Sequence, residues 1–320
     1  MYKRILWLAM LVMMLMSMVG ISTAQTNTSP CEIGFRPVVD AVNTVVCVPE
    51  NPQRIVALSE VDIDALLALG IMPIAVTDGR GQVTPPHYLI DQLPSDVVST
   101  GTFFQPNLEV VLEQAPDLIL FAGFTDEAVL AQLNAIAPVY NAATFAENWQ
   151  IHLVRLGNAL NMQAQALELI SAYEIRVHDI RQALGDETHG EFVVVRWAVE
   201  GPQIMAPRVL SNLILMDIGL TPPAEIPQLE DGHAHTPPLS LETLDIIDVD
   251  WVFIGTLQST GEANDALMQA LETPLFQSLA IAQTGRYFVV DGSIWTSVGG
   301  YIGAMTILDD IETSMLGGDA

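Results

Sequence analysis

Short apolar runs alternate with helix-like segments along most of the chain. Residues 55–58 and 74–76 are apolar runs, and the segment 62–69 between them has apolar positions at helical spacing and ends at Gly70. Short, fully apolar strands alternating with helices are typical of a parallel sheet that helices cover on both faces. The pattern therefore predicts a β-α-β unit over residues 55–76.

The same alternation continues and predicts two α/β lobes of similar size. Strands expected at 118–121 and near Val139 complete an N-terminal lobe over residues 51–146. A second lobe is expected over residues 186–320. Its predicted strands are 192–195, 251–254 and 287–290, and its predicted helices are 209–218, 242–247, 264–271 and a last one after Gly299.

The segment between the lobes, residues 147–185, has apolar positions at helical spacing and contains no proline. Only Gly157 interrupts the good helix formers. The pattern predicts one continuous helix of roughly 57 Å, at 1.5 Å per residue. Such a helix is too long for either lobe and would connect the two.

The first 24 residues resemble a secretory signal peptide. Lys3 and Arg4 precede a long apolar run, and small residues end at Ala24, the expected cleavage site. An uncleaved membrane anchor is the alternative, because the apolar run is close to the lower length limit for a span. The residues before Cys31 do not fit a lipoprotein signal, and no other run is long enough to cross a membrane. The protein is therefore expected to be exported.

Residues 25–50 hold the only two cysteines, Cys31 and Cys47. In an exported protein, two cysteines are most simply a disulfide; free thiols or metal ligands are the alternative. Apolar residues alternate on both sides of a turn-like segment at 40–43, which predicts a hairpin that the disulfide would staple.

The chain is strongly acidic, with 11 Lys and Arg against 38 Asp and Glu and a net charge of −27. Lys3 is the only lysine. Such a charge repels nucleic acid, so a nucleic-acid partner is not expected. The simplest interpretation is an acidic exported protein.

Several motifs, in order, resemble those of the periplasmic binding proteins that serve ABC importers of iron siderophores and cobalamin. They are NPQRIVALSEVDIDALLALGIMPIAVTD, NLEVVLEQAPDLILF, VVVRWAVEGPQIM, LSLETLDIIDVDWVFIG, GRYFVVDGSIWTSVGG and AMTILDDI, and they span about residues 36–314. Each motif alone is weak, and the ordered set is fairly specific. The resemblance implies an α/β fold of two Rossmann-like lobes with mainly parallel sheets, bridged by a single long helix, with the ligand between the lobes.

Ligands of such sheets bind beyond the carboxyl ends of the strands. Seven loops should therefore face the cleft: residues 59–60, 77–82, 101–105, 123–124, 196–197, 256–259 and 293–300. Arg196 ends the first strand of the second lobe, and its guanidinium can donate several hydrogen bonds to the oxygens of a ferric siderophore. The resemblance implies the same role for Arg196. A structural ion pair is the alternative in so acidic a chain.

Further ligand contacts are expected from two tryptophans, two arginines and other aromatic residues. The resemblance favours Trp295, while strand alternation puts Trp197 opposite Arg196, where burial against a helix is an equal alternative. Arg208 and Arg80 are candidate cations, against simple surface exposure. Residues that could line the cleft are Phe103, Phe104 and Tyr301, although core packing is the commoner fate of aromatic residues.

Glu109 and Glu242 each open a predicted helix, one in each lobe. The helix dipole alone favours glutamate in the first turn. The resemblance implies more: relatives carry one glutamate per lobe at these places, and the pair docks on arginines of the membrane permease.

His233 and His235 could bind a divalent metal, but a solvated loop is the favoured interpretation because no third ligand is fixed by spacing. No catalytic motif and no cofactor motif occurs in the sequence. We therefore expect a monomeric, non-enzymatic binding protein that captures a ferric siderophore, a small-molecule ferric chelate, and delivers it to an ABC permease. Cobalamin or haem as the ligand, or a sensor without transport, are the alternatives.

Overall fold

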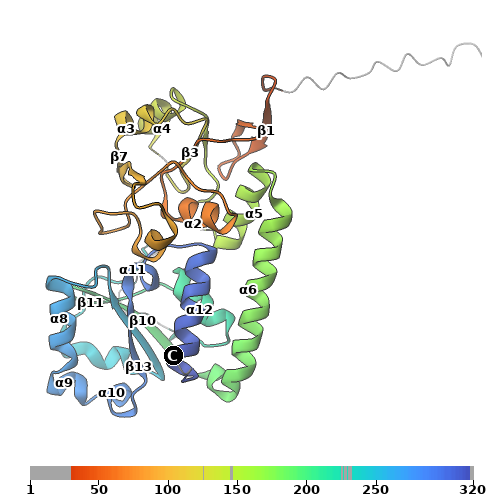
Figure 1. The fold of residues 1–320 in the computed structure, drawn as a ribbon. Helices are drawn as coiled ribbons and strands as arrows, with labels where there is room; N and C mark the ends of the chain where they lie inside the picture. Colours follow the sequence, from red (N-terminus) through yellow and green to blue (C-terminus); the bar gives the residue numbers. More distant parts are fainter. Residues whose placement is uncertain are drawn as a thin grey trace, which may run out of the picture.

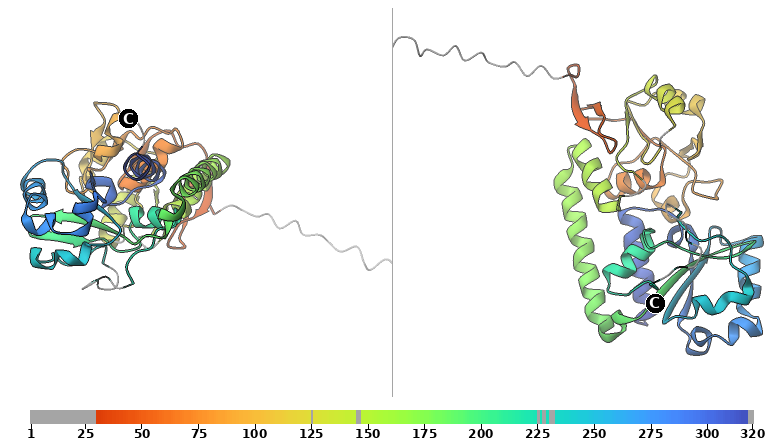
Figure 2. Two further views of the ribbon diagram at one scale, coloured as in Figure 1. Left: turned by 90° about the horizontal axis from the view of Figure 1, so that it is seen from below. Right: turned by 180° about the vertical axis from the view of Figure 1, so that it is seen from behind.

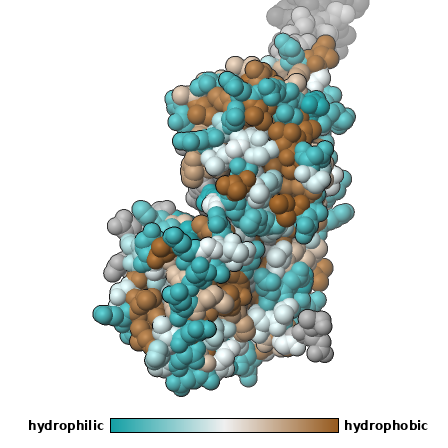
Figure 3. All heavy atoms as spheres, turned by 60° about the vertical axis from the view of Figure 1, so that its left-hand side comes forward, coloured by the Kyte–Doolittle hydropathy of each residue, from teal (hydrophilic) through white to brown (hydrophobic). Residues whose placement is uncertain are grey.

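The computed structural model shows two lobes, one above the other, with a long helix along one side of both (Figure 1). It describes residues 30–124, 126–144, 147–224, 226, 229 and 233–317. The signal peptide predicted over residues 1–24 lies outside the described residues. The molecule narrows between the lobes, and hydrophilic and hydrophobic residues are mixed over the visible face of both lobes (Figure 3).

The N-terminal lobe is built on a parallel five-stranded sheet of order β5-β4-β3-β8-β9. Every strand is short, and all but the edge strand β5 are fully buried, as expected for a sheet covered on both faces. The strands are β3 (Ile55–Ala57), β4 (Ala75–Val76), β5 (Val98–Ser99), β8 (Leu118–Leu120) and β9 (Val139–Tyr140). The other elements are α2 (Glu60–Ala68), η1 (His87–Gln92), α3 (Leu108–Glu113), α4 (Glu127–Asn134) and the small hairpin β6 (Gly101–Thr102) and β7 (Gln105–Pro106).

The N-terminal hairpin is present and carries the predicted disulfide. Strands β1 (Phe35–Val39) and β2 (Val45–Pro49) pair antiparallel, and Cys31 is bonded to Cys47. The Arg36 guanidinium donates to the backbone carbonyl oxygens of Asn158 and Ala159. The hairpin is therefore held on the lobe by hydrogen bonds as well as by the chain.

The C-terminal lobe has a four-stranded sheet of order β11-β10-β12-β13. Strands β10 (Phe192–Ala198), β12 (Trp251–Thr256) and β13 (Tyr287–Asp291) are parallel, and β11 (Gly201–Ile204) pairs antiparallel with β10. The helices are η2 (Gly185–His189), α7 (Leu210–Asp217), η3 (Leu241–Ile247), α8 (Glu262–Leu271), α9 (Pro274–Gln277), α10 (Ala280–Thr284), α11 (Gly292–Trp295) and α12 (Tyr301–Met315).

The prediction of one continuous helix over residues 147–185 is wrong. The segment forms two helices, α5 (Trp149–Ala159) and α6 (Gln163–Leu184), and only α6 runs along both lobes (Figure 1). The chain turns at Asn161, whose φ is 58°. Gly157 permits the turn, because a Cβ there would lie 2.8 Å from the Cβ of Ala166. The turn lets α5 fold back against α6.

The lobes are also joined through α12, which runs alongside α6 and contacts α2 of the N-terminal lobe (Figure 2). The fully buried carboxylate of Asp64 in α2 accepts hydrogen bonds of 2.9–3.0 Å from the backbone N–H groups of Gly300, Ile302 and Gly303. One N-terminal side chain therefore caps a C-terminal helix. Burial raises the pKa of Asp64, while these hydrogen bonds act in the opposite direction.

Residues of both lobes form one continuous apolar cluster that includes α5, α6, α7 and α12. Two smaller clusters lie on the outer faces of the two sheets. Across the described residues, no helix has the length and hydropathy needed to cross a membrane.

Candidate functional site

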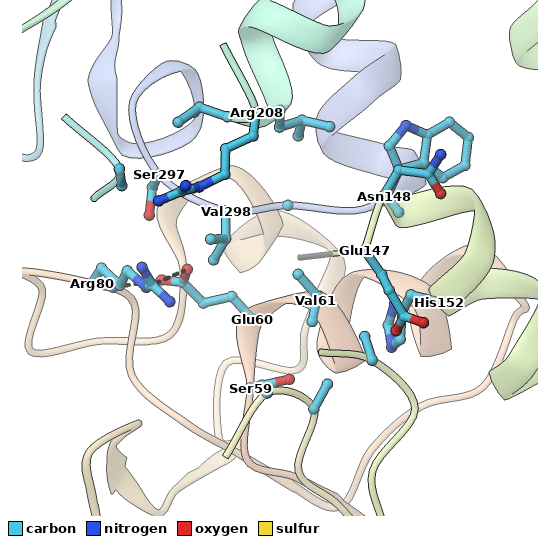
Figure 4. A pocket seen from close by; sticks show the side chains of 18 of the residues that line it. Ser59, Glu60, Val61, Arg80, Glu147, Asn148, His152, Arg208, Ser297 and Val298 are labelled. Atoms are coloured by element: carbon cyan, nitrogen blue, oxygen red, sulfur yellow. Dashed lines mark hydrogen bonds and ion pairs between the residues drawn. The ribbon is translucent and has the colours of Figure 1, made fainter. Parts of the chain in front are cut away.

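A cleft of about 310 Å³ lies between the lobes, at the carboxyl ends of the parallel strands (Figure 4). The N-terminal lobe lines it with the β3–α2 turn, the loops after β4, β8 and β9, and the start of α5. The C-terminal lobe lines it with β10, the β11–α7 connection and the loop after α11. Its volume is at the lower end of the range for small-molecule sites.

Arg196 lies near the end of β10 and reaches the cleft as predicted. Its guanidinium donates to the hydroxyl of Thr296, at 3.1 Å, and to the Thr296 backbone carbonyl oxygen. No carboxylate among the described residues forms an ion pair with it. Burial lowers the pKa of Arg196 to about 10, with a smaller contribution from nearby Arg80, so the group stays charged at neutral pH. Among the described residues, no adjacent acid balances its charge.

Arg208 lies just before α7 and lines the same wall of the cleft. Its side chain is exposed and extends towards Ser297 (Figure 4). Within the described residues it has neither a hydrogen bond nor an ion pair. The C-terminal lobe therefore offers two guanidinium groups, Arg196 and Arg208, to a ligand.

Arg80 follows β4 and lines the opposite wall, but it is already paired. Its Nε lies 3.8 Å from Oε2 of Glu60, and its backbone N–H donates to Oε1 of the same carboxylate at 2.5 Å. The guanidinium also lies over the ring of Phe103, 5.8 Å from the centroid. Burial raises the pKa of Glu60 to about 7, against the opposing attraction of Arg80.

Glu147 is the second acid of the cleft, and Arg155 neutralises it. The guanidinium of Arg155 donates to both oxygens of Glu147, each at 2.8 Å. These bonds lower the pKa of Glu147 to about 2. The pair contributes little net charge to the site.

A buried chain of polar groups lies under the N-terminal wall. Ser59 donates its hydroxyl to Asp62 at 2.5 Å, and the other oxygen of Asp62 lies 2.9 Å from Nε2 of His152. A hydrolytic site needs the nucleophile next to the base. Here the carboxylate separates Ser59 from His152, so the chain anchors α5 to α2 instead of activating the serine.

Four of the predicted aromatic contacts lie away from the cleft. Trp295 is fully buried, stacks on Phe253 at 4.5 Å and donates to Asp310. Trp197 is buried in the outer core of the C-terminal lobe, as its alternation with Arg196 allowed. Phe104 is 69% exposed, and Tyr301 packs against Trp149. Of the predicted residues, the structure brings together Arg196, Arg208, Arg80 and Phe103.

The contribution of α5 to the cleft was not predicted from the sequence. Glu147, Asn148, Trp149 and His152 all line the cleft, although this segment was assigned to the bridging helix. The positive φ of Asn161 redirects α5, and an Asn at that place was the one available signal. The predicted loop 256–259 does not line the cleft. Its Gln258 instead donates to the backbone carbonyl oxygen of Gly81 in the opposite lobe.

The two candidate docking acids lie on separate lobes. Glu109 is exposed in the first turn of α3, and Glu242 is exposed in the first turn of η3. Figure 1 places α3 on the side of its lobe away from α6. Helix η3 packs against α9, which Figure 1 places on the corresponding side of the other lobe. Helices α3 and α9 therefore both lie on the side of the molecule away from α6 (Figure 1).

That His233 and His235 lie in a solvated loop and hold no metal stays a prediction from the sequence. His235 Nδ1 lies 2.8 Å from the backbone oxygen of Thr236. Among the described residues, no group of three or more His, Cys, Asp or Glu is arranged to hold a metal ion.

Two α/β lobes, one bridging helix and a cationic cleft between them define the class of two-lobe solute-binding proteins. The sequence agrees. Residues 55–293 match the family model described as "Periplasmic binding protein", and the chain belongs to this family.

The chain is 32% identical over 321 residues, 97% of each chain, to the "Probable siderophore-binding lipoprotein YfiY" of Bacillus subtilis. It is 28% identical to the "Achromobactin-binding periplasmic protein" of Dickeya dadantii, over 83% of this chain and 88% of the relative. The structure of Staphylococcus aureus SirA complexed with staphyloferrin B superimposes with a TM-score of 0.75, at 20% identity over 88% of this chain and 98% of SirA. The two-lobe fold is thereby confirmed.

Proposed function

We propose that this protein is an extracytoplasmic solute-binding protein that captures an anionic ferric siderophore between its lobes and delivers it to an ABC importer. The observation that carries the proposal is the pair Arg196 and Arg208, two guanidinium groups with no carboxylate partner among the described residues. The names of the relatives support the iron-chelate class, since they are described as binding siderophores, achromobactin and Fe(3+)-citrate.

The chemistry of the cleft fits such a ligand. Guanidinium groups donate paired hydrogen bonds to carboxylate or other anionic oxygens, and they do so more strongly where water is excluded. Arg196 is held by Thr296 so that it points in one direction. In a chain with a net charge of −27, an uncompensated pair of cations in one cleft is unusual and favours an anionic ligand.

Capture without catalysis is the simplest reading of the polar groups. Ser59 donates to a carboxylate and not to His152, so no activated nucleophile faces the cleft among the described residues. Export is supported by the relatives, which are named as periplasmic proteins or lipoproteins. Cleavage after Ala24, in place of a lipid anchor, remains our prediction from the sequence alone.

Delivery requires a surface that a permease can recognise. We assign this role to Glu109 and Glu242, one exposed acid on each lobe. Charges at the edge of an interface steer and orient a partner more than they strengthen binding. Two acids on separate lobes suit a partner with two equivalent halves.

Cobalamin or haem as the ligand, and a sensor that uses the same cleft without transport, are the alternatives. An aromatic, weakly charged cleft would favour cobalamin. Two aromatic residues, Phe103 and Trp149, line the cleft, and the other predicted aromatic contacts lie outside it. Because the cleft also holds the guanidinium groups of Arg196 and Arg208, the anionic ferric chelate is favoured.

The test is tryptophan fluorescence of the mature protein titrated with ferric citrate, ferric staphyloferrin B, ferric bacillibactin, a ferric hydroxamate, cobalamin and haem. Trp149 lines the cleft and serves as the reporter. Saturable quenching by an anionic ferric chelate, weakened about 10- to 100-fold in Arg196→Ala, is expected for the loss of one charge-assisted contact.

Arg54→Ala is the matched control, since Arg54 bonds to the backbone of Gln114 and Ala115 outside the cleft. Its affinity should equal that of the wild type. Quenching by cobalamin or haem alone would show that the ligand is not a ferric siderophore. Unchanged affinity in Arg196→Ala would refute the assigned site.

A further inference from the structure

The cleft lining contains a buried acid, Glu60, beside a cation that an anionic ligand would contact. Glu60 opens α2 at the carboxyl end of β3, and its side chain is 5% exposed. Oε1 accepts the Arg80 backbone N–H, and the buried Oε2 has no donor within hydrogen-bond distance, although the nearby Ser297 hydroxyl favours the ionised form. Figure 4 shows the carboxylate of Glu60 beside the Arg80 side chain, with dashed lines marking their interaction.

An anionic ligand and an ionised Glu60 compete for the same cation. The Nε of Arg80 lies 3.8 Å from Oε2 of Glu60, so a ligand oxygen on this guanidinium would bring two negative charges close together in a poorly hydrated place. Like charges in such surroundings favour the protonated form of the more buried group. Glu147 differs, because the guanidinium of Arg155 donates to both of its oxygens.

We propose that Glu60 is a specificity-determining residue that takes up a proton when an anionic ligand engages Arg80, so that the cleft accepts a more negative ligand than its fixed charges would allow. The proposal rests on the proposed function and deepens it. In the empty cleft, the ionised carboxylate of Glu60 holds Arg80. When the ligand arrives, protonation of Glu60 releases the Arg80 guanidinium to the ligand.

The other charges around Glu60 do not provide the same response. Arg80 from the loop after β4 and Arg196 from β10 are permanent cations. Burial raises the pKa of Tyr88 in η1 well above its usual range, so it stays neutral. Asp64, on the same helix as Glu60, uses its oxygens to cap α12 and is not part of the cleft lining.

The sign of the pH dependence follows from these contacts. Burial already places the pKa of Glu60 at about 7 in the free protein, and an anion beside it raises that pKa further. Binding at pH 7 should then take up about half a proton, and affinity should fall by up to about tenfold per pH unit above pH 7. Below pH 6, Glu60 is already protonated and affinity should level off.

The experiment is isothermal titration of the mature protein with ferric citrate or ferric staphyloferrin B, in buffers of different ionisation enthalpy, at pH 6, 7 and 8. The slope of the observed enthalpy against the buffer enthalpy counts protons. Glu60→Gln should remove the uptake and bind at pH 8 at least as tightly as at pH 6. Glu147→Gln, the other acid of the cleft, should keep the wild-type proton count even where its affinity changes.

Wild-type binding without proton uptake at pH 7 and 8 would overturn the inference and leave the proposed function intact, and this result needs no variant to fold. Equal uptake in Glu60→Gln and wild type would assign the proton to another group and would also overturn it. Failure of every ferric chelate to bind would overturn the proposed function and this inference together.

Discussion

At the scale of single residues, Asp64 joins the two lobes, because it lies in α2 and caps α12. Its side chain is fully buried, and its two oxygens accept three backbone N–H groups at the start of α12. A helix N-terminus carries partial positive charge and unpaired donors, so a carboxylate there stabilises both. The neighbouring Gly300 is required for this approach, since a Cβ would lie 2.6 Å from Oδ1 of Asp64.

Asp64→Ala should therefore lower the free energy of unfolding by about 3 kcal/mol, because three buried donors lose their acceptor. Asp64→Asn retains one acceptor oxygen and a similar shape, and its loss should be smaller. Urea denaturation followed by circular dichroism measures both. Equal stability of the alanine variant and the wild type would contradict the capping role.

Also at this scale, Glu60 should make stability depend on pH in the ligand-free protein. Its pKa is raised to about 7 in the folded state, so the stability it contributes is largest below the unfolded value near 4.5 and is lost as pH rises through 7. Relative to Glu60→Gln, the wild type should lose on the order of 3 kcal/mol between pH 4 and pH 8. Chemical denaturation at each pH measures this difference. If the free energy of unfolding changed equally with pH in the two proteins, the prediction would be wrong.

The place of a single side chain was predictable where a simple rule relates its position in the sequence to the direction in which it points. Strand alternation separated Arg196 from Trp197, and the strand-end rule placed Arg196 in the cleft. The same reasoning failed for Trp295, because its burial depends on Phe253 and Asp310, which are distant in the sequence.

At the scale of elements, the break between α5 and α6 determines which residues reach the ligand. A straight helix would carry residues 147–152 along the side of the molecule. The turn at residues 160–162 brings them to the cleft, where Trp149 is 5% exposed and packs edge-on against Tyr173 of α6. The close approach of Gly157 to Ala166 makes this packing possible.

Gly157→Ala should destabilise the protein by about 1–2 kcal/mol, although alanine is the better helix former by about 1 kcal/mol. The new methyl would meet the Cβ of Ala166 at 2.8 Å and the backbone oxygen of Met162 at 3.2 Å. Thermal unfolding would show the difference. Ser171→Ala, on an exposed position of α6, is the control and should be neutral or slightly stabilising; a stabilised Gly157→Ala would show that α5 and α6 can separate freely.

The central strands of both sheets and the longer helices of the lobes followed from apolar runs, because this signal is local. Strands β5 and β11 and the short helices α9, α10 and α11 were not predicted. Ser59 before α2 and Asn107 before α3 each accept a first-turn N–H in the structure, although neither cap was predicted from the sequence. The break in the bridging segment was missed because its cause is packing between α5 and α6. No proline or glycine cluster marks it.

At the scale of the whole molecule, the two acids of the proposed docking surface should affect transport and not capture. Glu109→Ala and Glu242→Ala lie outside the cleft lining, so affinity for the ferric chelate should stay within about twofold of the wild type. Iron uptake through the cognate permease in proteoliposomes should fall in each single variant and further in the double variant. Undiminished uptake by the double variant would favour the sensor alternative.

The two-lobe plan was predictable because the strand-helix rhythm occurs twice with a long helical segment between. How the lobes meet was not. It depends on the contacts of Asp64 with α12 and of Gln258 with Gly81, which join residues far apart in the chain.

The isolated cations of the cleft also bear on how fast a ligand can arrive. Arg196 and Arg208 attract an anion only at short range, whereas the acidic surface of a chain with net charge −27 repels it from farther away. Salt screens the distant repulsion more than the contacts within the cleft, because screening acts over about 10 Å at 0.1 M. Association of an anionic chelate should therefore accelerate as salt is added, the opposite of the usual behaviour of charged partners that steer each other together.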